Sequence, residues 1–494
     1  MDDRALIHEL AHSLIVHALS RHACLRLHIC LLKCHCEPVK AGVADRSYQR
    51  ETMPVQQDGK ARSAKGTEPD SAVSALSAWS TVFIFFLLYS LAYVDRQILN
   101  FLVDPISRTL GISDFQFSLV QGVGFALLFT LAGIPIGWLV DHKPRRLIMG
   151  AGLTIWSIAA GICGLASQYW QLLLGRIGLS VGEATLAPAS FSILSDIFPP
   201  RKLTLPMTVM TLGANAGSIL AAAVAGWAMA VVPAAGVEVP LLGRLHNWQV
   251  AMLVIAVPGL LMVPTLFAIK EPVRQRAVAA ARPGSSAMLA ALGHNRRFYG
   301  GYFTGLGFYS MGNYAALSWL PTFFIRQHGW EVKEVALAIG SLHIVAGLTG
   351  TVVMGYLVDR WYAAGRKDAH CLFLGITSIV QLVAFSAAML LDNPMLALAA
   401  LVPFKAVSNF SGIGAAGLQI CTPRETRVQV SAVYLLVYSL LGAGIGPTLV
   451  AVFTDFIFAD PQRIGSAMLL SVAGCAILAT GFLLYAAPAM RRVE

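Results

Sequence analysis

The sequence predicts an all-α membrane protein, with twelve transmembrane helices in two pseudo-symmetric six-helix bundles. Three observations lead to this fold class. Hydrophobic residues make up 56% of the 494-residue chain and charged residues only 13%, whereas soluble proteins carry about 25% charged residues. Twelve apolar segments each approach the ~20 residues that a helix needs to cross a bilayer. The loops between these segments repeat halfway along the chain, as they do in duplicated transporter folds.

Residues 1–76 differ from the rest of the chain, because they contain no apolar run long enough to span a bilayer. They hold 10 Lys and Arg residues and 6 of the 12 histidines. We therefore expect a basic disordered tail. Met53 is a candidate start of the protein, in which case the residues before it are a mis-extended reading frame. The cysteines and histidine at 30–36 have a spacing that matches no common zinc site, so no metal is expected there.

From Trp79 onward, apolar segments follow one another with short polar breaks. The longest break, residues 270–298, contains six Lys and Arg residues. It divides the spans into an N-terminal bundle at 77–269 and a C-terminal bundle at 299–490, with 270–298 as a cytoplasmic linker. The predicted spans are 79–104, 114–140, 146–167, 170–197, 202–231, 247–269, 299–326, 331–360, 369–391, 394–420, 428–456 and 463–489.

Alternate loops differ strongly in positive charge. One set of loops, together with the C-terminus, holds 18 Lys and Arg residues, and the opposite set holds 5. Because basic loops remain in the cytoplasm, both termini and the central linker are predicted to be cytoplasmic. The net charge of +10 is thereby explained by membrane topology, and no nucleic-acid partner is expected.

One loop sequence occurs twice, at equivalent places in the two halves. Residues 137–146 read Gly-Trp-Leu-Val-Asp followed by three basic residues, and residues 355–367 read Gly-Tyr-Leu-Val-Asp-Arg followed by two more. The two copies stand 218 residues apart. An internal repeat of this kind is typical of transporters built from two related bundles.

These residues resemble a known family. Gly137-xxx-Asp141-xxx-Arg145-Arg146 is similar to the loop signature of the major facilitator superfamily, and the second copy lies where that family carries its own. The resemblance covers about residues 79–489. It implies a monomer in a bacterial inner (plasma) membrane. Three further segments resemble the spinster-like branch, which includes sphingolipid and lysolipid transporters: residues 93–96, 176–184 and 195–198. The resemblance to this branch implies movement of an amphiphile, either by proton linkage or by facilitation.

Four ionisable residues lie inside predicted spans, where a charge near the bilayer centre costs roughly 2.5–3.5 kcal/mol and needs a partner or a wet cavity. Asp95 and Arg96 lie in span 79–104, and Arg176 and Glu183 lie in span 170–197. The resemblance implies that both spans line a central cavity. An Asp95–Arg176 or an Arg96–Glu183 contact is then possible. Arg176 and Glu183 are two turns apart on one helix face, so they can serve one cavity together. Arg96 and Arg176 are predicted to be substrate or cavity residues.

The first span also carries a polar-aromatic stripe with helical spacing, which we expect to line the cavity: Tyr89, Tyr93, Arg96 and Asn100. Asp95 is turned about 100° away from Arg96, among apolar residues. Such a dry setting favours the protonated form of a carboxyl group. We therefore assign proton coupling to Asp95 and Glu183, with Asp95 as the favoured carrier. The competing interpretation is a fixed ion pair that only orients the helices.

The loop after span 114–140 is predicted to form a cytoplasmic gate. Asp141 ends a helix, where a negative charge is unfavourable against the helix dipole, so it needs a cation nearby. Arg145 or Arg146 can supply that cation. The competing interpretation is a basic loop that only anchors the topology. The predicted gate consists of Gly137, Asp141, Arg145, Arg146 and Asp196.

Weaker candidates lie in the second bundle. His343 and Lys405 are ionisable residues inside predicted spans, and each is either a cavity residue or part of the packing. The aromatic residues of span 299–326 form either an apolar wall for a lipid-like substrate or simple packing: Tyr302, Phe303, Phe308, Tyr309 and Tyr314.

The sequence as a whole predicts a proton-coupled secondary transporter that works by alternating access and moves an amphipathic organic anion or lysolipid-like molecule. The alternative is proton-coupled uptake of a small organic acid, such as a sugar acid or an aromatic acid. A broad apolar interface that opens laterally would favour the lipid, and a small polar pocket with converging arginines would favour the acid. The chain lacks a G-x-x-x-x-G-K-[ST] loop, so ATP drive is not expected. We expect no enzymatic activity, cofactor or metal.

Overall fold

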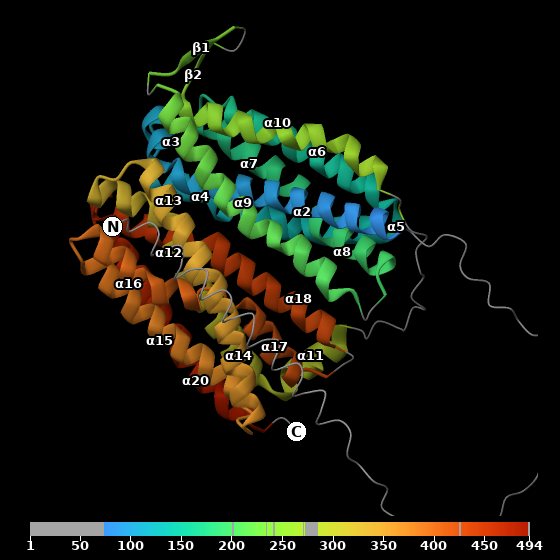
Figure 1. Ribbon diagram of the computed structural model, residues 1–494. Helices are drawn as coiled ribbons and strands as arrows, with labels where there is room; N and C mark the ends of the chain where they lie inside the picture. Colours follow the sequence, from blue (N-terminus) through green and yellow to red (C-terminus); the bar gives the residue numbers. More distant parts are fainter. Residues whose placement is uncertain are drawn as a thin grey trace, which may run out of the picture. The chain divides into compact units, whose positions relative to one another are not determined.

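The computed structural model describes residues 74–199, 202–233, 235–240, 243–269, 271, 285–423 and 426–492. The cysteine cluster at 30–36, Met53 and most of the predicted tail and linker lie outside these residues. Within the described chain, twelve spanning helices form the two six-helix bundles that the sequence predicts (Figure 1). Most helix boundaries fall within a few residues of the predicted spans.

The N-terminal bundle contains six spans, three of which consist of two consecutive segments. A short helix, α3 (Val103–Leu110), follows the first span. The spans are α2 (Ala75–Gln97) with η1 (Ile98–Phe101), α4 (Asp114–Gln121) with α5 (Val123–His142), α6 (Arg145–Gly164), α7 (Tyr169–Glu183) with α8 (Leu186–Ile197), α9 (Thr204–Val231) and α10 (Asn247–Ala268).

The C-terminal bundle repeats this plan. Two short helices precede spans: α11 (Ser285–His294), which lies inside the predicted linker, and η6 (Pro461–Arg463). The spans are α12 (Arg296–His328), α13 (Val332–Leu342) with η3 (His343–Leu348) and α14 (Thr349–Ala363), α15 (Ala369–Leu390), α16 (Pro394–Val407) with α17 (Ser411–Cys421), α18 (Arg427–Val437) with η4 (Tyr438–Ile445), α19 (Gly446–Val452) and η5 (Phe453–Ile457), and α20 (Ile464–Met490).

Helix α12 differs from the other spans in composition. By length and composition alone, eleven of the described spans are long and apolar enough to cross a membrane, and α12 is not among them. It has 33 residues, with many Gly, Tyr and Ser residues in its middle. Most of its length is buried against α20, η4 and α19. Because α12 is surrounded by protein rather than lipid, it does not need an apolar surface to span the bilayer.

A short β-hairpin joins α9 to α10 and was not predicted. Strand β1 (Val237–Val239) pairs antiparallel with β2 (Gly243–Leu245). Gly236 and Gly243 adopt positive φ angles of 85° and 75°, which glycine reaches without the steric cost that other residues incur. The polar segment reads as a loop in the sequence, because three-residue strands are too short to show an alternating pattern.

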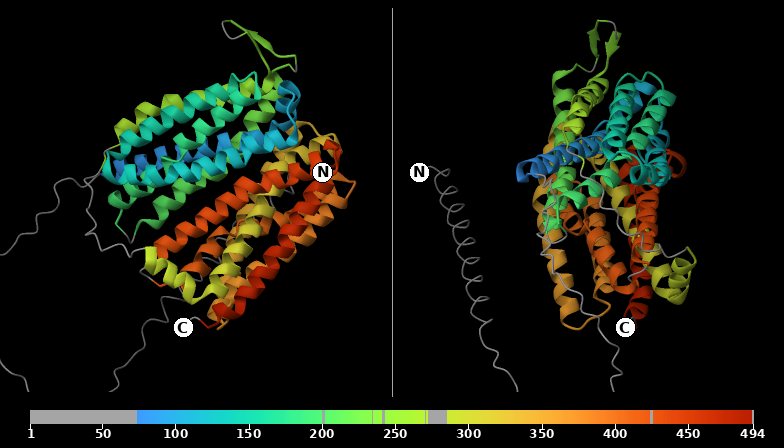
Figure 2. Two further views of the ribbon diagram at one scale, coloured as in Figure 1. Left: turned by 180° about the vertical axis from the view of Figure 1, so that it is seen from behind. Right: turned by 90° about the vertical axis from the view of Figure 1, so that its right-hand side faces the viewer.

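The hairpin marks one end of the molecule, here called the hairpin end, and the basic loops mark the other, here called the basic end. Contacts between the two bundles involve α9 with α13, α5 with η4, α4 with α19 and η1 with α12. At one of these contacts, a Cβ added to Gly122 would lie 2.6 Å from the carbonyl oxygen of Gly444. The bundles lie side by side near the hairpin end and diverge toward the basic end (Figures 1 and 2).

Candidate functional site

A cavity lies between the bundles and receives side chains from both. Its wall is unusually polar for the interior of a membrane protein. The N-terminal bundle contributes Arg96, Asn100, Gln121 and Arg176, and the C-terminal bundle contributes Tyr314 and Ser318. Polar groups inside a membrane protein are costly and mark sites where a solute or an ion is handled.

Arg96 forms an ion pair with Glu183 at this wall. The carboxylate is buried, with 2% of its side chain exposed, whereas 29% of the Arg96 side chain is exposed. One of the two contacts that the sequence made possible is therefore present. The arrangement places a cation at the surface of the cavity, with its counter-charge behind it in the protein.

Asp95 lies behind the cavity and is buried, with 3% exposure. Its dry placement is therefore as predicted. Trp156 of α6 donates a hydrogen bond of 2.5 Å from Nε1 to Asp95 Oδ2. The predicted contact with Arg176 takes a different form, because Arg176 Nη1 donates to the backbone carbonyl of Asp95 at 3.1 Å. A helix residue presents both a side chain and a carbonyl, and sequence spacing does not say which one a neighbour reaches.

Both carboxylates retain hydrogen-bonding capacity. Asp95 Oδ1 and Glu183 Oε2 are buried without a hydrogen-bond partner, as are the Nε atoms of Arg96 and Arg176. An unsatisfied buried polar atom costs roughly 1–3 kcal/mol. Each carboxylate therefore keeps one oxygen that could accept a further hydrogen bond.

Aromatic rings hold the two arginines beside the cavity. The guanidinium of Arg96 lies 5.0 Å from the ring centre of Phe125 and 4.8 Å from that of Phe129, and the guanidinium of Arg176 lies 5.2 Å from that of Phe125. A cation over an aromatic face is stabilised by about 0.5–2 kcal/mol, and more strongly when it is desolvated. The shared ring thus helps to keep two like charges on one wall.

The predicted polar-aromatic stripe is present over most of its length. Tyr93, Arg96 and Asn100 line the cavity. Tyr89 lies one turn nearer the basic end, and a Cβ added to Gly213 of α9 would lie 2.9 Å from the Cβ of Tyr89. This close packing assigns Tyr89 to the contact between α2 and α9 in this state.

The aromatic residues of α12 do not form a continuous wall. Tyr302 donates a hydrogen bond to the carbonyl of Gly414 at 2.9 Å, and Tyr309 donates to that of Val407 at 2.9 Å. Both rings are fully buried inside the C-terminal bundle. Among the five aromatic residues singled out in this span, Tyr314 lines the cavity. The others are better explained by packing.

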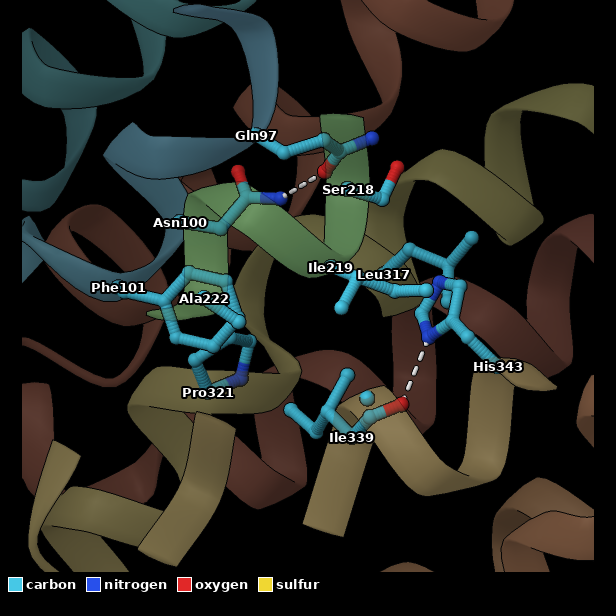
Figure 3. A pocket seen from close by; sticks show the side chains of 11 residues that line it. Gln97, Asn100, Phe101, Ser218, Ile219, Ala222, Leu317, Pro321, Ile339 and His343 are labelled. Atoms are coloured by element: carbon cyan, nitrogen blue, oxygen red, sulfur yellow. Dashed lines mark hydrogen bonds between the residues drawn. The ribbon is translucent and has the colours of Figure 1, made fainter. Parts of the chain in front are cut away.

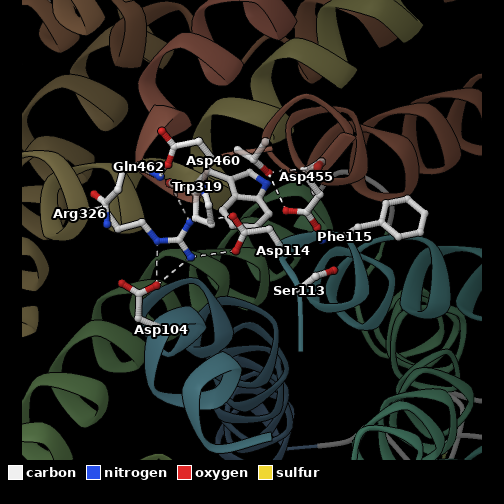
Figure 4. A network of polar contacts seen from close by, with 12 residues as sticks. Asp104, Ser113, Asp114, Phe115, Trp319, Arg326, Asp455, Asp460 and Gln462 are labelled. Carbon is white, nitrogen blue, oxygen red and sulfur yellow. Dashed lines mark hydrogen bonds and ion pairs between the residues drawn. The ribbon is translucent and has the colours of Figure 1, made fainter. Parts of the chain in front are cut away.

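The two bundles are joined by an ion-pair cluster at the hairpin end (Figure 4). Arg326 of α12 makes a bidentate contact with Asp114, with Nη1–Oδ2 and Nη2–Oδ1 distances of 2.7 and 2.8 Å. Its Nε also donates to Asp104 Oδ1 at 2.8 Å. Nearby, the backbone amide of Phe115 donates to Asp455 Oδ2 at 2.7 Å. Each of these contacts joins one bundle to the other, so the cluster closes this end.

In the sequence analysis, Arg326 is one of the five Lys and Arg residues in the less basic set of loops, and no contact was predicted for it. A signal was nevertheless present, because the predicted topology places Asp104, Asp114 and Arg326 on the same side of the membrane, each at the end or the start of a predicted span. Their pairing requires α3, α4 and α12 to meet, and no local pattern shows that they do.

A second ion-pair cluster lies at the basic end, within the N-terminal bundle. Arg145, 1% exposed, contacts Asp196 and donates from Nε to Glu271 Oε1 at 3.2 Å. Arg146 Nε lies 3.9 Å from Glu271 Oε2. Arg145 and Asp196, two residues of the predicted gate, are thus in contact, whereas Glu271 was missed because it lies in the predicted linker. Among the described residues, the ion pairs that join the two bundles all involve Arg326.

The remaining gate residues are less enclosed. Asp141 is exposed at the end of α5 and, like Lys143, has an interaction partner. A Cβ added to Gly137 would meet no atom within 4 Å. In this state, therefore, no close helix contact requires glycine at position 137.

An Arg326→Gln variant is expected to open the hairpin end. Hydrogen bonds to charged groups contribute about 1.5–3 kcal/mol each, so losing them shifts the balance between open and closed states at least about tenfold. Spin labels on exposed Thr109 and Gln462, in a cysteine-free background, would report a longer distance in the variant. Arg463→Gln removes an exposed arginine of the same region and serves as the control. An unchanged distance distribution in Arg326→Gln would contradict the proposed closing role.

Comparisons with known proteins agree with this architecture. The family model described as Major Facilitator Superfamily matches residues 85–447. The chain is 26% identical over 412 residues to an MFS-type efflux pump of Mycolicibacterium smegmatis, covering 80% of this chain and 89% of that one. It is 27% identical over 303 residues to a probable L-galactonate transporter of Escherichia coli K12, covering 58% of this chain and 62% of that one.

Solved structures show the same fold. The crystal structure of a bacterial homologue of the human lysosomal transporter Spinster, in an inward-facing and unoccupied conformation, superposes with a TM-score of 0.69. The sequences are 22% identical, and the match covers 85% of this chain and 97% of that one. At this identity, the likeness is evidence for the arrangement of helices alone.

Proposed function

The chain belongs to the Major Facilitator Superfamily and is a secondary transporter in the membrane rather than an enzyme, and we propose that it carries a small organic anion together with protons by alternating access. The main support is the exposed Arg96 on the cavity wall, with buried Glu183 as its counter-charge. A substrate carboxylate that enters the cavity meets an arginine already held by a protein carboxylate. The two anions therefore compete for one cation.

Protonation of Glu183 resolves this competition. While Glu183 is ionised, it holds Arg96 and a second anion gains little by approaching. Once Glu183 is protonated, Arg96 is free to bind the substrate carboxylate, and the proton and the anion are loaded together. Loss of the proton restores the Arg96–Glu183 pair and expels the anion. Asp95 directly precedes Arg96 in the chain, and its carboxyl oxygen without a hydrogen-bond partner makes it a second proposed proton site.

The cavity favours an organic acid over a lipid. Its wall combines two arginines with amides, hydroxyls and aromatic rings, which is the small polar pocket expected for an acid. A large apolar groove of about 1130 Å³ exists, but α6 and α7 line it on the outer surface of the N-terminal bundle, with Ile155, Ile158 and Leu174 in its wall. It shares no lining residue with the cavity of Arg96 and Arg176.

We further propose that the described state is open toward the cytoplasm. The basic end is the cytoplasmic end by its charge, and the Arg326 cluster closes the opposite end. In the other state, the hairpin end opens, and the cytoplasmic gate at Gly137, Asp141, Arg145, Arg146 and Asp196 helps to close the basic end. The bundles at 77–269 and 299–490 would then move as units about the cavity, in a monomer of a bacterial inner membrane.

Reconstitution of the full chain in proteoliposomes tests the proposed function. With an inwardly directed proton gradient, vesicles should accumulate a transported acid above its outside concentration, and a protonophore should abolish the accumulation. The similarity to a probable L-galactonate transporter makes six-carbon sugar acids the first substrates to try, with benzoate and lysophosphatidylcholine as alternatives. Gradient-driven movement of the lysolipid but of no acid would overturn the proposal.

A further inference from the structure

A second, smaller cavity adjoins the arginine cavity. Gln97, Asn100 and Leu317 line both. Its wall also comes from both bundles, with Ser218 on α9 and His343 at the start of η3 (Figure 3). The two cavities thus share one wall between the bundles, with arginines at one side of it and uncharged polar groups at the other.

Three amide side chains form a directed hydrogen-bond chain along this shared wall. Gln121 Nε2 donates to Asn100 Oδ1, and Asn100 Nδ2 donates to Gln97 Oε1 at 2.7 Å. The direction of these bonds leaves Gln121 Oε1 as the terminal acceptor, and this atom is buried without a partner. At the other end, the NH2 group of Gln97 is the terminal donor.

His343 supplies a second acceptor. Its Nδ1 lies 2.8 Å from the carbonyl oxygen of Ile339, a group that can only accept a hydrogen bond. Nδ1 therefore carries the proton, and in the neutral ring Nε2 is an acceptor. Figure 3 shows this ring at the cavity, opposite Gln97 and Asn100.

The chemistry of these groups defines what they can bind. A carboxylate cannot donate to Gln121 Oε1 or to His343 Nε2, and neither can an alkyl chain or a phenyl ring. A hydroxyl group can donate to either acceptor and can also accept from the NH2 of Gln97. Between the polar groups, Phe101, Ile219 and Pro321 offer apolar contacts for the C–H groups of a substrate.

We propose that this amide and histidine wall is a hydroxyl-recognition subsite, so that the transported anion is a polyhydroxylated acid whose carboxylate lies at the arginines and whose hydroxyl groups lie along Gln121, Asn100, Gln97 and His343. This inference rests on the proposed anion transport. It goes beyond that proposal, because it excludes aromatic and fatty acids as good substrates of the same arginine site.

A comparison of matched acids tests the subsite. The purified full chain is titrated with gluconate, galactonate and mannonate, which differ only in hydroxyl configuration, and with hexanoate, which has the same carbon count without hydroxyls. Binding is read from thermal stabilisation. We expect at least one hydroxylated acid to bind at least about tenfold more tightly than hexanoate, because sites built to bond a hydroxyl discriminate strongly against its loss.

Variants then assign the preference to the wall. Gln121→Leu and His343→Leu should each reduce the ratio of the affinity for the hydroxylated acid to that for hexanoate at least about threefold. Gln381→Leu is the matched control, because Gln381 is a buried glutamine in α15 whose Nε2 has no partner, and it should keep the full ratio.

The outcomes separate the two proposals. Equal affinities for hexanoate and all three hydroxylated acids would overturn the subsite and leave anion transport in place. An unchanged ratio in both wall variants would also overturn it. If no carboxylate binds and lysophosphatidylcholine does, the proposed function fails and the subsite fails with it.

Discussion

A Glu183→Gln variant is expected to lose proton-driven accumulation while it retains exchange of the substrate across the membrane. One pH unit corresponds to about 1.4 kcal/mol per proton, so each coupled proton allows up to about tenfold accumulation. Glutamine resembles a permanently protonated glutamate, and it leaves Arg96 free at every pH. The variant should therefore bind the anion without a proton cycle, and its accumulation ratio should fall to about one.

Proteoliposomes loaded with unlabelled substrate measure both properties. Counterflow of labelled substrate should persist in Glu183→Gln. It should no longer change with pH over the range in which counterflow by the unmodified protein does. Asp95→Asn is expected to lower accumulation as well, because the free carboxyl oxygen of Asp95 is the second proposed proton site. Glu238→Gln, in the exposed β-hairpin, is the control. Undiminished accumulation in Glu183→Gln would remove this residue from the coupling mechanism.

An Arg96→Ala variant is expected to lose both substrate affinity and stability. It removes the cation from the cavity and also leaves Glu183 buried without its counter-charge. Breaking a buried ion pair by removing one partner costs about 3–5 kcal/mol, and loss of a charge-assisted bond to a carboxylate costs about 1.5–3 kcal/mol of binding free energy. We therefore expect affinity to fall by at least about tenfold, with a clear decrease in melting temperature.

The double variant Arg96→Ala/Glu183→Gln separates these two effects. It removes both charges, so no uncompensated carboxylate remains, and the melting temperature should recover most of the loss. Affinity for the acid should not recover, since the cation is still missing. Thermal unfolding and ligand titration of the same samples give both quantities, and Arg244→Ala in the exposed hairpin controls for loss of one positive charge. Recovery of binding in the double variant would show that Arg96 does not hold the substrate.

The two ends of the molecule differ in how firmly ion pairs join the bundles. Arg326 joins the bundles at the hairpin end through Asp104 and Asp114, whereas Arg145 pairs with Asp196 of its own bundle and with Glu271 just after that bundle. The arginine cavity lies between them, at the contact of the bundles. A change in the Arg96–Glu183 pair therefore occurs at the interface about which the two bundles are proposed to move.

Much of the fold could be predicted from the sequence, because the bilayer imposes simple conditions on each segment. A span must be apolar and near 20 residues long, and hydrophobic runs and basic loops show this directly. Helix α12 is the informative exception. Its composition misses the criteria of length and apolarity, although residues 299–326 were counted among the twelve apolar segments of the sequence.

Several members of the site could also be predicted. Charges inside a span are rare enough to be noticed one by one, which identified Asp95, Arg96, Arg176 and Glu183. Helical periodicity then placed Asp95 in a dry setting and Arg96 toward the cavity, and both placements agree with the observed burial. Periodicity fixes the face of a helix on which a side chain lies, and it needs no knowledge of the rest of the chain.

The sequence by itself thus determined the number of spans, their division into two bundles and the charges that lie within them. Only the tertiary structure decided which group each charge meets: Trp156 at Asp95, Glu271 at Arg145 and two aspartates at Arg326. The reason is physical. The span pattern reflects the surrounding lipid, which acts on every segment separately, whereas an ion pair depends on the packing of helices that are far apart in the chain.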